Sequence, residues 1–248
     1  MLFRTLFILL CMTFSMQVFA QFKTVEYFDK NQKLNGLLLS GKKKNNNKAV
    51  LILPAWKGAD NEAKQAALDL KKEGYMVMIA DIYGEGNTPQ SNDEAKKLSG
   101  HYKENFKSYQ QRIELALNEL IKQGANKNNI AVIGYCFGGT GTLEVARANF
   151  NVKGVVCIHG GLAKAESREN LKINTKVLVL HGAADKSVSE AEAEQFRTEM
   201  KASQADWQMI YYADCGHTWT NPESPEYNAL MAKRAWQHTL LFLKEILP

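Results

Sequence analysis

Short apolar runs alternate along the chain with longer amphipathic stretches. The continuous apolar runs are residues 50–53, 75–79, 130–133, 155–158 and 177–180. Strands of this composition need cover on both faces, which is typical of a parallel sheet. Residues 207–212 add a last strand, and residues 24–40 are expected to form two short strands on either side of Asn31.

The stretches between these runs have the spacing of amphipathic helices. We expect helices at residues 61–73, 93–123, 139–149, 189–202 and 226–246. Strands and helices that alternate in this way form right-handed βαβ units with helices on both faces of the sheet. The sequence therefore predicts a single doubly wound α/β domain with a mostly parallel sheet, in which ligands bind where the strands end.

The first twenty residues differ in kind from the rest. Arg4 supplies a positive charge, residues 6–14 are apolar, and small residues around Ala20 precede Gln21. This pattern predicts a signal peptide at residues 1–20 and an exported domain at residues 21–248, in the periplasm or the medium. A retained N-terminal anchor is the alternative. A lipoprotein is excluded because Leu10, not a small residue, precedes Cys11.

The composition and charge exclude other classes of protein. The chain has 248 residues, of which 45% are apolar, and this is ordinary for a globular enzyme. Its net charge of +5 is scattered, apart from the run Lys42 to Lys44. A nucleic-acid-binding protein normally concentrates its basic residues on one face, so no nucleic-acid partner is expected. After signal cleavage no membrane contact is expected either, and the oligomeric state is open.

Three cysteines remain after the expected cleavage: Cys136, Cys157 and Cys215. They form no CxxC pair, so neither a redox motif nor a zinc knuckle is indicated. An odd number in an oxidising compartment leaves at least one thiol free or paired between chains. A disulfide between Cys136 and Cys215 is possible in principle but is not favoured.

Cys136 lies in the sequence Gly134-Tyr135-Cys136-Phe137-Gly138, which follows an apolar strand and precedes a helix. This is the pattern of a nucleophile elbow with cysteine as the nucleophile. Glycines two residues before and after the nucleophile allow the backbone to pack tightly around a strained turn. The start of the following helix favours a thiolate over a thiol. The alternative is a buried cysteine in a glycine-rich turn with a purely structural role.

A nucleophilic cysteine needs a base, and the base needs an acid that orients it. Asp185 follows the strand at 177–180, and His217 follows the strand at 207–212, so both lie at the same sheet edge as Cys136. Asp214 is a second candidate for the acid. His159 and His181 also end strands, whereas His101 lies in a polar stretch. No HExxH spacing or carboxylate set indicates a metal.

Two groups of residues complete the expected site. The oxyanion formed by attack on a carbonyl needs N–H donors, for which we predict the backbone of Phe137 and Trp56. Candidate substrate-binding residues are Tyr83, His159 and Trp219, because each follows a strand at the reactive edge. Ordinary packing in strand-end loops is the alternative for these three. No cofactor is expected.

Several segments carry a family resemblance: GYMVMIADIYGEG at 74–86, GYCFGG at 134–139, HGAAD at 181–185 and Gly216-His217. Over residues 50–247 the chain resembles the dienelactone hydrolase family of α/β-hydrolases. The phrases VCIHGG at 156–161 and DWQ at 206–208 resemble a bacterial branch whose substrates are undefined. The resemblance implies an α/β-hydrolase fold, a Cys136–His217–Asp185 triad and hydrolysis of carboxylic esters or lactones.

The chain departs from the dienelactone-cleaving members at three positions. Ala55 stands where those enzymes have a glutamate that holds the thiol, and Glu85 and Asn221 stand where they have substrate-binding arginines. Dienelactone itself is therefore not the expected substrate. The rival hypothesis is a non-catalytic ligand-binding protein on a hydrolase fold. Ala55 favours this rival, whereas the intact triad favours the enzyme.

Overall fold

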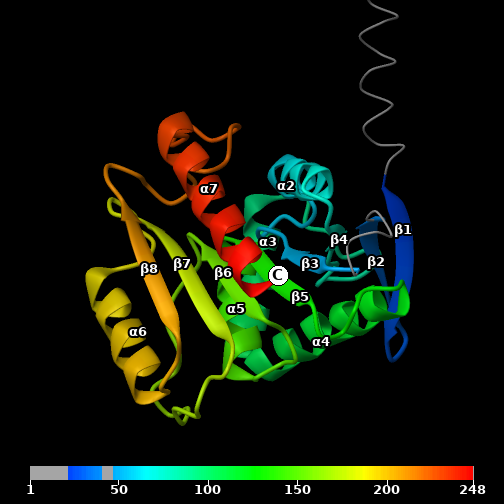
Figure 1. Cartoon of the computed structure of the whole chain (residues 1–248), viewed down its shortest axis with the longest axis horizontal. Coiled ribbons are helices and arrows are strands. Elements are labelled where there is room, and N and C mark those ends of the chain that lie inside the picture. Colours follow the sequence, from blue (N-terminus) through cyan, green and yellow to red (C-terminus); the bar gives the residue numbers. More distant parts are fainter. Residues whose placement is uncertain (1–21, 41–46, 248) are drawn as a thin grey trace, which may run out of the picture.

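Eight strands form one sheet in the computed structural model, which describes residues 22–40 and 47–247 (Figure 1). The spatial order is β1-β2-β4-β3-β5-β6-β7-β8. Strands β3 to β8 are parallel, and the β1–β2 hairpin is antiparallel and joins β4 in antiparallel fashion. The bounds are β1 Lys23–Asp29, β2 Gln32–Leu39, β3 Ala49–Leu53, β4 Met76–Ile79, β5 Ile130–Tyr135, β6 Gly154–Ile158, β7 Lys176–Gly182 and β8 Trp207–Tyr212.

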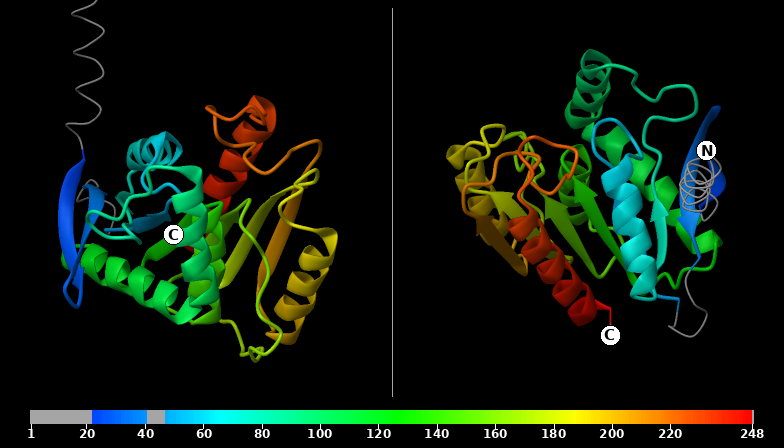
Figure 2. Two further views of the ribbon diagram at one scale, coloured as in Figure 1. Left: turned by 180° about the vertical axis from the view of Figure 1, so that it is seen from behind. Right: turned by 90° about the horizontal axis from the view of Figure 1, so that it is seen from above.

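Six helices flank this sheet in the described part of the chain. They are α2 Asn61–Lys72, α3 Asn92–Glu104, α4 Phe106–Lys122, α5 Phe137–Arg147, α6 Glu190–Ala202 and α7 Ala229–Ile246. Helices α2 and α7 cover one face, and α3 to α6 lie on the other, as the view from above shows (Figure 2). The predicted doubly wound, mostly parallel α/β sheet is confirmed.

The central strands are buried on both faces, as their continuous apolar sequences predict. In β3 the side chains of Val50 and Ile52 face α2 and α7, while Leu51 and Leu53 face the opposite helices. All four are fully buried. Two apolar cores thus sandwich the sheet and fix the positions of the loops at its carboxyl edge.

Three predicted helices differ from those observed. Helix α5 begins and ends two residues earlier than predicted, at Phe137 and Arg147. The single helix expected at 93–123 is divided at Asn105, whose ψ of 60° is not helical. The Asn105 side-chain amide donates to the carbonyl of His101, and this contact caps α3, which ends at Glu104. Helix α4 then begins at Phe106. The last helix begins at Ala229 rather than at residue 226, because Asn228 caps it by accepting from the N–H of Met231.

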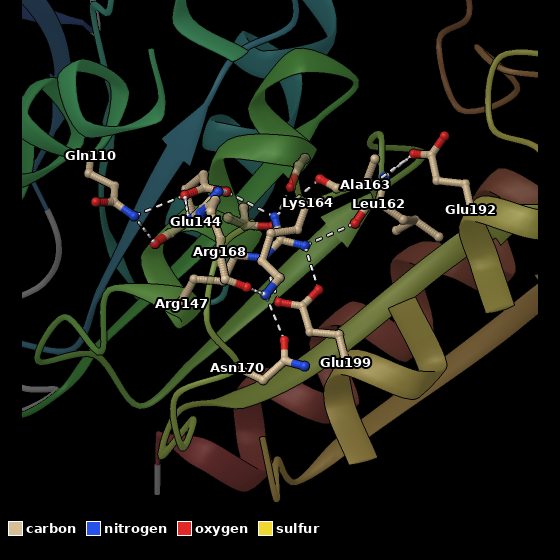
Figure 3. A network of polar contacts seen from close by, with 12 residues as sticks. Gln110, Glu144, Arg147, Leu162, Ala163, Lys164, Arg168, Asn170, Glu192 and Glu199 are labelled. Atoms are coloured by element: carbon tan, nitrogen blue, oxygen red, sulfur yellow. Dashed lines mark hydrogen bonds and ion pairs between the residues drawn. The ribbon is translucent and has the colours of Figure 1, made fainter. Parts of the chain in front are cut away.

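A buried ion network attaches the long loop between β6 and β7 to the helices beneath it (Figure 3). Arg147 of α5 bonds to Glu144 and to both carboxylate oxygens of Glu199 on α6. It also donates to the carbonyl of Leu162, and Arg168 of the loop forms a bidentate pair with Glu144. These bonds fix the helix that follows Cys136 against its neighbour.

The predicted signal peptide and the run Lys42 to Lys44 lie outside the described residues. Within the described residues, no helix is long and apolar enough to cross a membrane.

Candidate active site

Cys136 lies in the sharp turn between β5 and α5, with a φ of 51° and a ψ of −111°. A non-glycine residue is rarely found in this strained backbone region outside functional sites. The turn is possible because its neighbours are glycines. A Cβ on Gly134 would lie 2.2 Å from the carbonyl oxygen of Gly138, and a Cβ on Gly138 would lie 2.0 Å from that of Leu53.

The structure brings Cys136, His217 and Asp185 into one chain of contacts. Sγ of Cys136 lies 3.1 Å from Nε2 of His217, and Nδ1 of His217 lies 2.8 Å from Oδ2 of Asp185. The thiol and the imidazole remain partly exposed, whereas the Asp185 carboxylate is buried. Three side chains from three separate strand-end loops therefore have the geometry of nucleophile, base and orienting acid.

Backbone contacts between two loops hold the acid and the base together. The N–H of Ala183 donates to the carbonyl of Tyr212, and that of Ala184 donates to Cys215. Glu226 then binds the next part of the His217 loop, accepting from the backbone N–H of His217 at 3.1 Å and of Thr218 at 2.9 Å. Glu226 was not predicted as a site residue, because nothing in the neighbouring sequence distinguishes it from a solvent-exposed acid.

The charges of the site favour a protonated His217. Burial opposes the charge, but the hydrogen bonds to Asp185 and Cys136 outweigh it and raise the pKa of His217 to about 10. The pKa of Asp185 is lowered, although burial acts in the opposite direction, because its carboxylate bonds to His217 and to the N–H of Ser187. An imidazolium beside Sγ stabilises a thiolate.

The other candidates named from sequence lie elsewhere. Asp214 is exposed, and the acid that contacts His217 is Asp185. His181 is buried against the ring of Tyr211, and His101 is exposed beside Asn105. Cys136, Cys157 and Cys215 are all free thiols, and burial raises the pKa of Cys157 to about 12. No group of three His, Cys, Asp or Glu side chains in the described residues is arranged to hold a metal ion.

Tyr83 contacts both predicted oxyanion-hole residues, Trp56 and Phe137. Its hydroxyl donates to the carbonyl of Trp56 at 2.8 Å, and its ring stacks on that of Phe137 with 5.8 Å between centroids. Phe137 is the first residue of α5, so its N–H has no acceptor within the helix. Tyr83 and Phe137 also line a cavity of about 250 Å³ beside Ala55 and Gly58.

His159 lies beneath the elbow rather than in an open pocket. It is 1% exposed, and both ring nitrogens are engaged by the protein. Its Nδ1 accepts from the N–H of Cys136 at 3.1 Å, and its Nε2 lies 2.7 Å from Oγ1 of Thr220, which donates to Glu62. Because the Thr220 proton is used on Glu62, Nε2 must carry the proton of the imidazole. Burial lowers the pKa of His159 to about 3, which agrees with a neutral ring.

Trp219, the third predicted substrate-binding residue, is fully buried and packs against Tyr212 and His159. Its position is a core position, which is the alternative that the sequence left open. Thr220 and Glu62, by contrast, were not selected from sequence. Glu62 occupies the first turn of α2, where an acidic residue is expected for the helix dipole alone, so the sequence carried no signal of its contact with Thr220.

The family departures also have defined positions. Ala55 lines the cavity next to Tyr83, and Glu85 is an exposed residue paired with Lys33 at 2.8 Å. The Asn221 side chain accepts from the N–H of Glu223. Neither of the two substituted arginine positions supplies a positive charge to the site.

The sheet, the strained cysteine turn and the three strand-end side chains define an α/β-hydrolase. Comparison with known proteins gives the family: the model of the dienelactone hydrolase family matches residues 34–247, and the chain belongs to this family. As a member, it is a hydrolase of the carboxylic ester or lactone type.

Three similar proteins illustrate the range of this family. A putative carboxymethylenebutenolidase of Escherichia coli K12 is 25% identical over 79% of this chain and 76% of its own length. A probable 2-oxo-3-(5-oxofuran-2-ylidene)propanoate lactonase of Bradyrhizobium is 24% identical over 79% of this chain and 83% of its own. The crystal structure of a dienelactone hydrolase-like promiscuous phosphotriesterase from metagenomic libraries is 26% identical, with a TM-score of 0.82 over 92% of this chain and 98% of that one.

Proposed function

We propose that the protein is a thiol-dependent hydrolase of carboxylic esters or lactones that uses Cys136, His217 and Asp185 as its triad. The observation that carries the proposal is the continuous chain of short contacts from Sγ of Cys136 through His217 to Asp185. The Cys136 thiolate attacks the carbonyl carbon, and the negative charge moves to the carbonyl oxygen. The N–H groups of Phe137 and Trp56 are the proposed donors to this oxyanion.

The collapse of the tetrahedral intermediate leaves a thioester on Cys136 and expels the alkoxide, which takes the proton from His217. The neutral His217 then removes a proton from water, which attacks the thioester carbonyl. Release of the carboxylate regenerates the thiolate and the protonated imidazole. In a lactone the alcohol and the acid leave as one molecule. Asp185 keeps the ring of His217 in the required orientation throughout both steps.

The substrate is proposed to be neutral rather than anionic. Glu85 and Asn221 supply no positive charge where the dienelactone-cleaving enzymes resembled by this chain have arginines. Glu85 adds a negative charge, which its exposed pair with Lys33 offsets in part. An anionic lactone thus lacks a clamp, and we expect uncharged acyl groups to be preferred.

A panel of p-nitrophenyl esters and lactones of varied charge tests the proposal. We expect the wild type to hydrolyse neutral members and the Cys136→Ala variant to lose this activity while remaining folded. Cys157→Ala is the control, because this buried thiol lies outside the triad. Undiminished hydrolysis by Cys136→Ala refutes the role of Cys136. A protein that reacts slowly with iodoacetamide, and equally so after His217→Ala, supports the non-catalytic binding protein instead.

Export is a second part of the proposal and rests on the pattern of residues 1–20 alone. Expression of the full chain in a secreting bacterium, followed by N-terminal sequencing of the extracytoplasmic fraction, tests it. We expect the mature chain to begin at Gln21. Full-length protein retained in the membrane fraction supports the anchor alternative.

A further inference from the structure

A second cavity lies between α2 and α7, on the face of the sheet where these two helices pack. Its volume is about 460 Å³, which is in the range of small-molecule sites. Helix α2, the loop that follows Trp219 and helix α7 form its walls, and Tyr135 and Ile158 form its floor. Among the described residues that line it, neither Cys136 nor His217 is present, so this cavity is separate from the triad.

The lining has the composition of a ligand site. Most of its surface is apolar, with Ala66, Ala232, Ala235, Pro222 and Trp236 among the contributors. Binding sites for small organic molecules typically combine such walls with a few convergent polar groups. A cavity left by imperfect packing would not be expected to contain polar groups without partners.

Two buried polar groups have unused hydrogen-bonding capacity at this cavity. Glu62 is 9% exposed, and only its Oε1 is engaged, by the hydroxyl of Thr220 at 2.5 Å. Tyr135 is 5% exposed, and its hydroxyl makes no hydrogen bond to another described residue. Both side chains line the cavity, and burial, followed by the nearby charge of Glu62, raises the pKa of Tyr135. One carboxylate oxygen and one hydroxyl therefore remain for a ligand.

The charges around the cavity select the sign of that ligand. Its charged lining residues are Glu62, Asp69, Glu223 and Lys233. Asp69 is already paired with Lys72, so Glu62 and Glu223 are the two carboxylates set against the cation of Lys233. Asp60, which caps α2, adds another carboxylate near Glu62. Such a field attracts a cation and repels an anion. The Glu62 carboxylate is also an acceptor, which matches an ammonium donor.

We propose that this cavity is a second binding site, for a small primary amine with an apolar body, with Glu62 as the anchor of its ammonium group. The apolar body would lie against Trp236 and the alanines of α2 and α7. The proposal goes beyond the hydrolase function and does not depend on Cys136 being catalytic.

Calorimetric titration of the Cys136→Ala protein at pH 8 with 2-phenylethylamine tests the proposal, since reaction at the thiol is then impossible. We expect saturable one-to-one binding. A charge-assisted hydrogen bond is worth about 10- to 100-fold in affinity, so 2-phenylethanol should bind about 10-fold more weakly or worse. The anion 3-phenylpropionate should not bind. Equal affinity for the amine and the alcohol, or no binding of the amine, overturns the proposal.

Variants of the same parent locate the site. Adding Glu62→Gln should reduce the affinity for the amine to that for the alcohol. Adding Glu114→Gln, which removes an exposed carboxylate from α4 on the opposite face, should change nothing. Ala232→Phe fills the cavity from the half-buried part of α7 and should abolish binding of both ligands. Unchanged amine binding after Ala232→Phe contradicts the assignment, even if the Glu62 variant fails to fold.

Discussion

The backbone N–H of Cys136 donates to Nδ1 of the buried His159 across 3.1 Å. The same N–H also points at the carbonyl oxygen of Ile158 at 3.0 Å. His159 itself has a positive φ of 40°, as does Cys136. The backbone is therefore strained at the ends of the neighbouring strands β5 and β6. Since the second ring nitrogen contacts Thr220, the nucleophile turn is connected through His159 to the start of α2.

Replacement of His159 should therefore impair the chemical step rather than substrate binding. His159→Phe removes one of the two acceptors of the Cys136 N–H, leaving only the carbonyl of Ile158, and allows the turn to shift. A displacement of about 1 Å at a nucleophile costs on the order of 100-fold in rate, so we expect kcat to fall about 10- to 100-fold with little change in KM. Steady-state kinetics on a neutral p-nitrophenyl ester measures this split.

His181→Phe is the matched control, because His181 is also a buried strand-end histidine and makes no side-chain hydrogen bond to a described triad residue. Only His159→Phe should slow alkylation of Cys136 by iodoacetamide, because the buried Nδ1 of His181 has no hydrogen bond to lose. If the two variants lose activity in proportion to their loss of stability, His159 has a purely structural role.

Asp185→Asn should change how the rate of Cys136 alkylation depends on pH. Asp185 is one of the groups that raise the pKa of His217 to about 10, and the neutral amide removes that contribution. His217 then loses its proton at lower pH, so less imidazolium is available near neutrality to stabilise the thiolate. We expect iodoacetamide to alkylate the variant more slowly than the wild type at pH 8.

The control for this measurement is Asp214→Asn, an exposed carboxylate on the His217 loop. Its alkylation profile between pH 5 and 10 should coincide with that of the wild type. A profile for Asp185→Asn that also coincides would exclude the proposed orienting role of Asp185.

The strands were the most predictable part of the fold. Continuous apolar runs specify burial on both faces, and the last strand has the predicted bounds of Trp207–Tyr212. Helix ends were less predictable, because they depend on single side-chain contacts. Asn105 divides one predicted helix, and Asn228 delays the start of another. Neither contact changes the apolar periodicity from which the helices were inferred.

The candidate site also has a part that was predictable from sequence and a part that was not. The contacts among Cys136, His217 and Asp185 follow from strand order, because the carboxyl ends of parallel strands share one edge. The contacts that support them do not follow from order or spacing. Glu62 and Thr220 are 158 positions apart in the chain, and only tertiary packing of α2 against the His217 loop brings them together.

The glycines of the chain should differ sharply in their tolerance of a methyl group. Gly138→Ala would place a Cβ 2.0 Å from a backbone oxygen of Leu53, so we expect the variant to fold poorly or to lose the elbow. Gly100→Ala lies inside α3 with no atom within 4 Å of the new Cβ. It should stabilise the protein by roughly 0.5 to 1 kcal/mol. Urea unfolding of both variants checks the contrast, and similar stability for the two would contradict the elbow geometry.

The buried ion network under the β6–β7 loop should be far more sensitive than its exposed counterpart. Arg147→Met leaves Glu199 without its buried partner and Glu144 with Arg168 alone, at an expected cost of about 3 to 5 kcal/mol of unfolding free energy. Arg197→Met removes an exposed pairing with Glu190 and Glu194 on α6, and a much smaller loss is expected because solvent screens these charges. Chemical denaturation of the two variants provides the test. Equal losses of unfolding free energy in the two variants would mean that the buried network stabilises the fold no more than the exposed pairs do.

Glu62 should make the protein less stable as the pH rises. Burial, and to a lesser extent the charge of Asp60, raise the pKa of Glu62 to about 7 in the folded state, against an ordinary value of 4.5, while the Thr220 hydroxyl opposes the shift. The folded state therefore holds a proton that the unfolded state releases, so this contribution to stability is present below pH 4.5 and is lost as the pH rises through 7. The full difference is roughly 3 kcal/mol.

Glu62→Gln removes this loss, so its unfolding free energy relative to the wild type should increase between pH 4.5 and pH 8. Asp60, Asp69, Glu223 and Lys233 also face this region, but they are present in both proteins, so their own titration largely cancels in the difference. Urea titrations at half-unit pH intervals measure it, with Glu114→Gln as the exposed control. A difference that does not change with pH would show that Glu62 is ionised at little cost in the folded protein. The cavity would then lack the buried, under-solvated carboxylate on which an ammonium ligand depends.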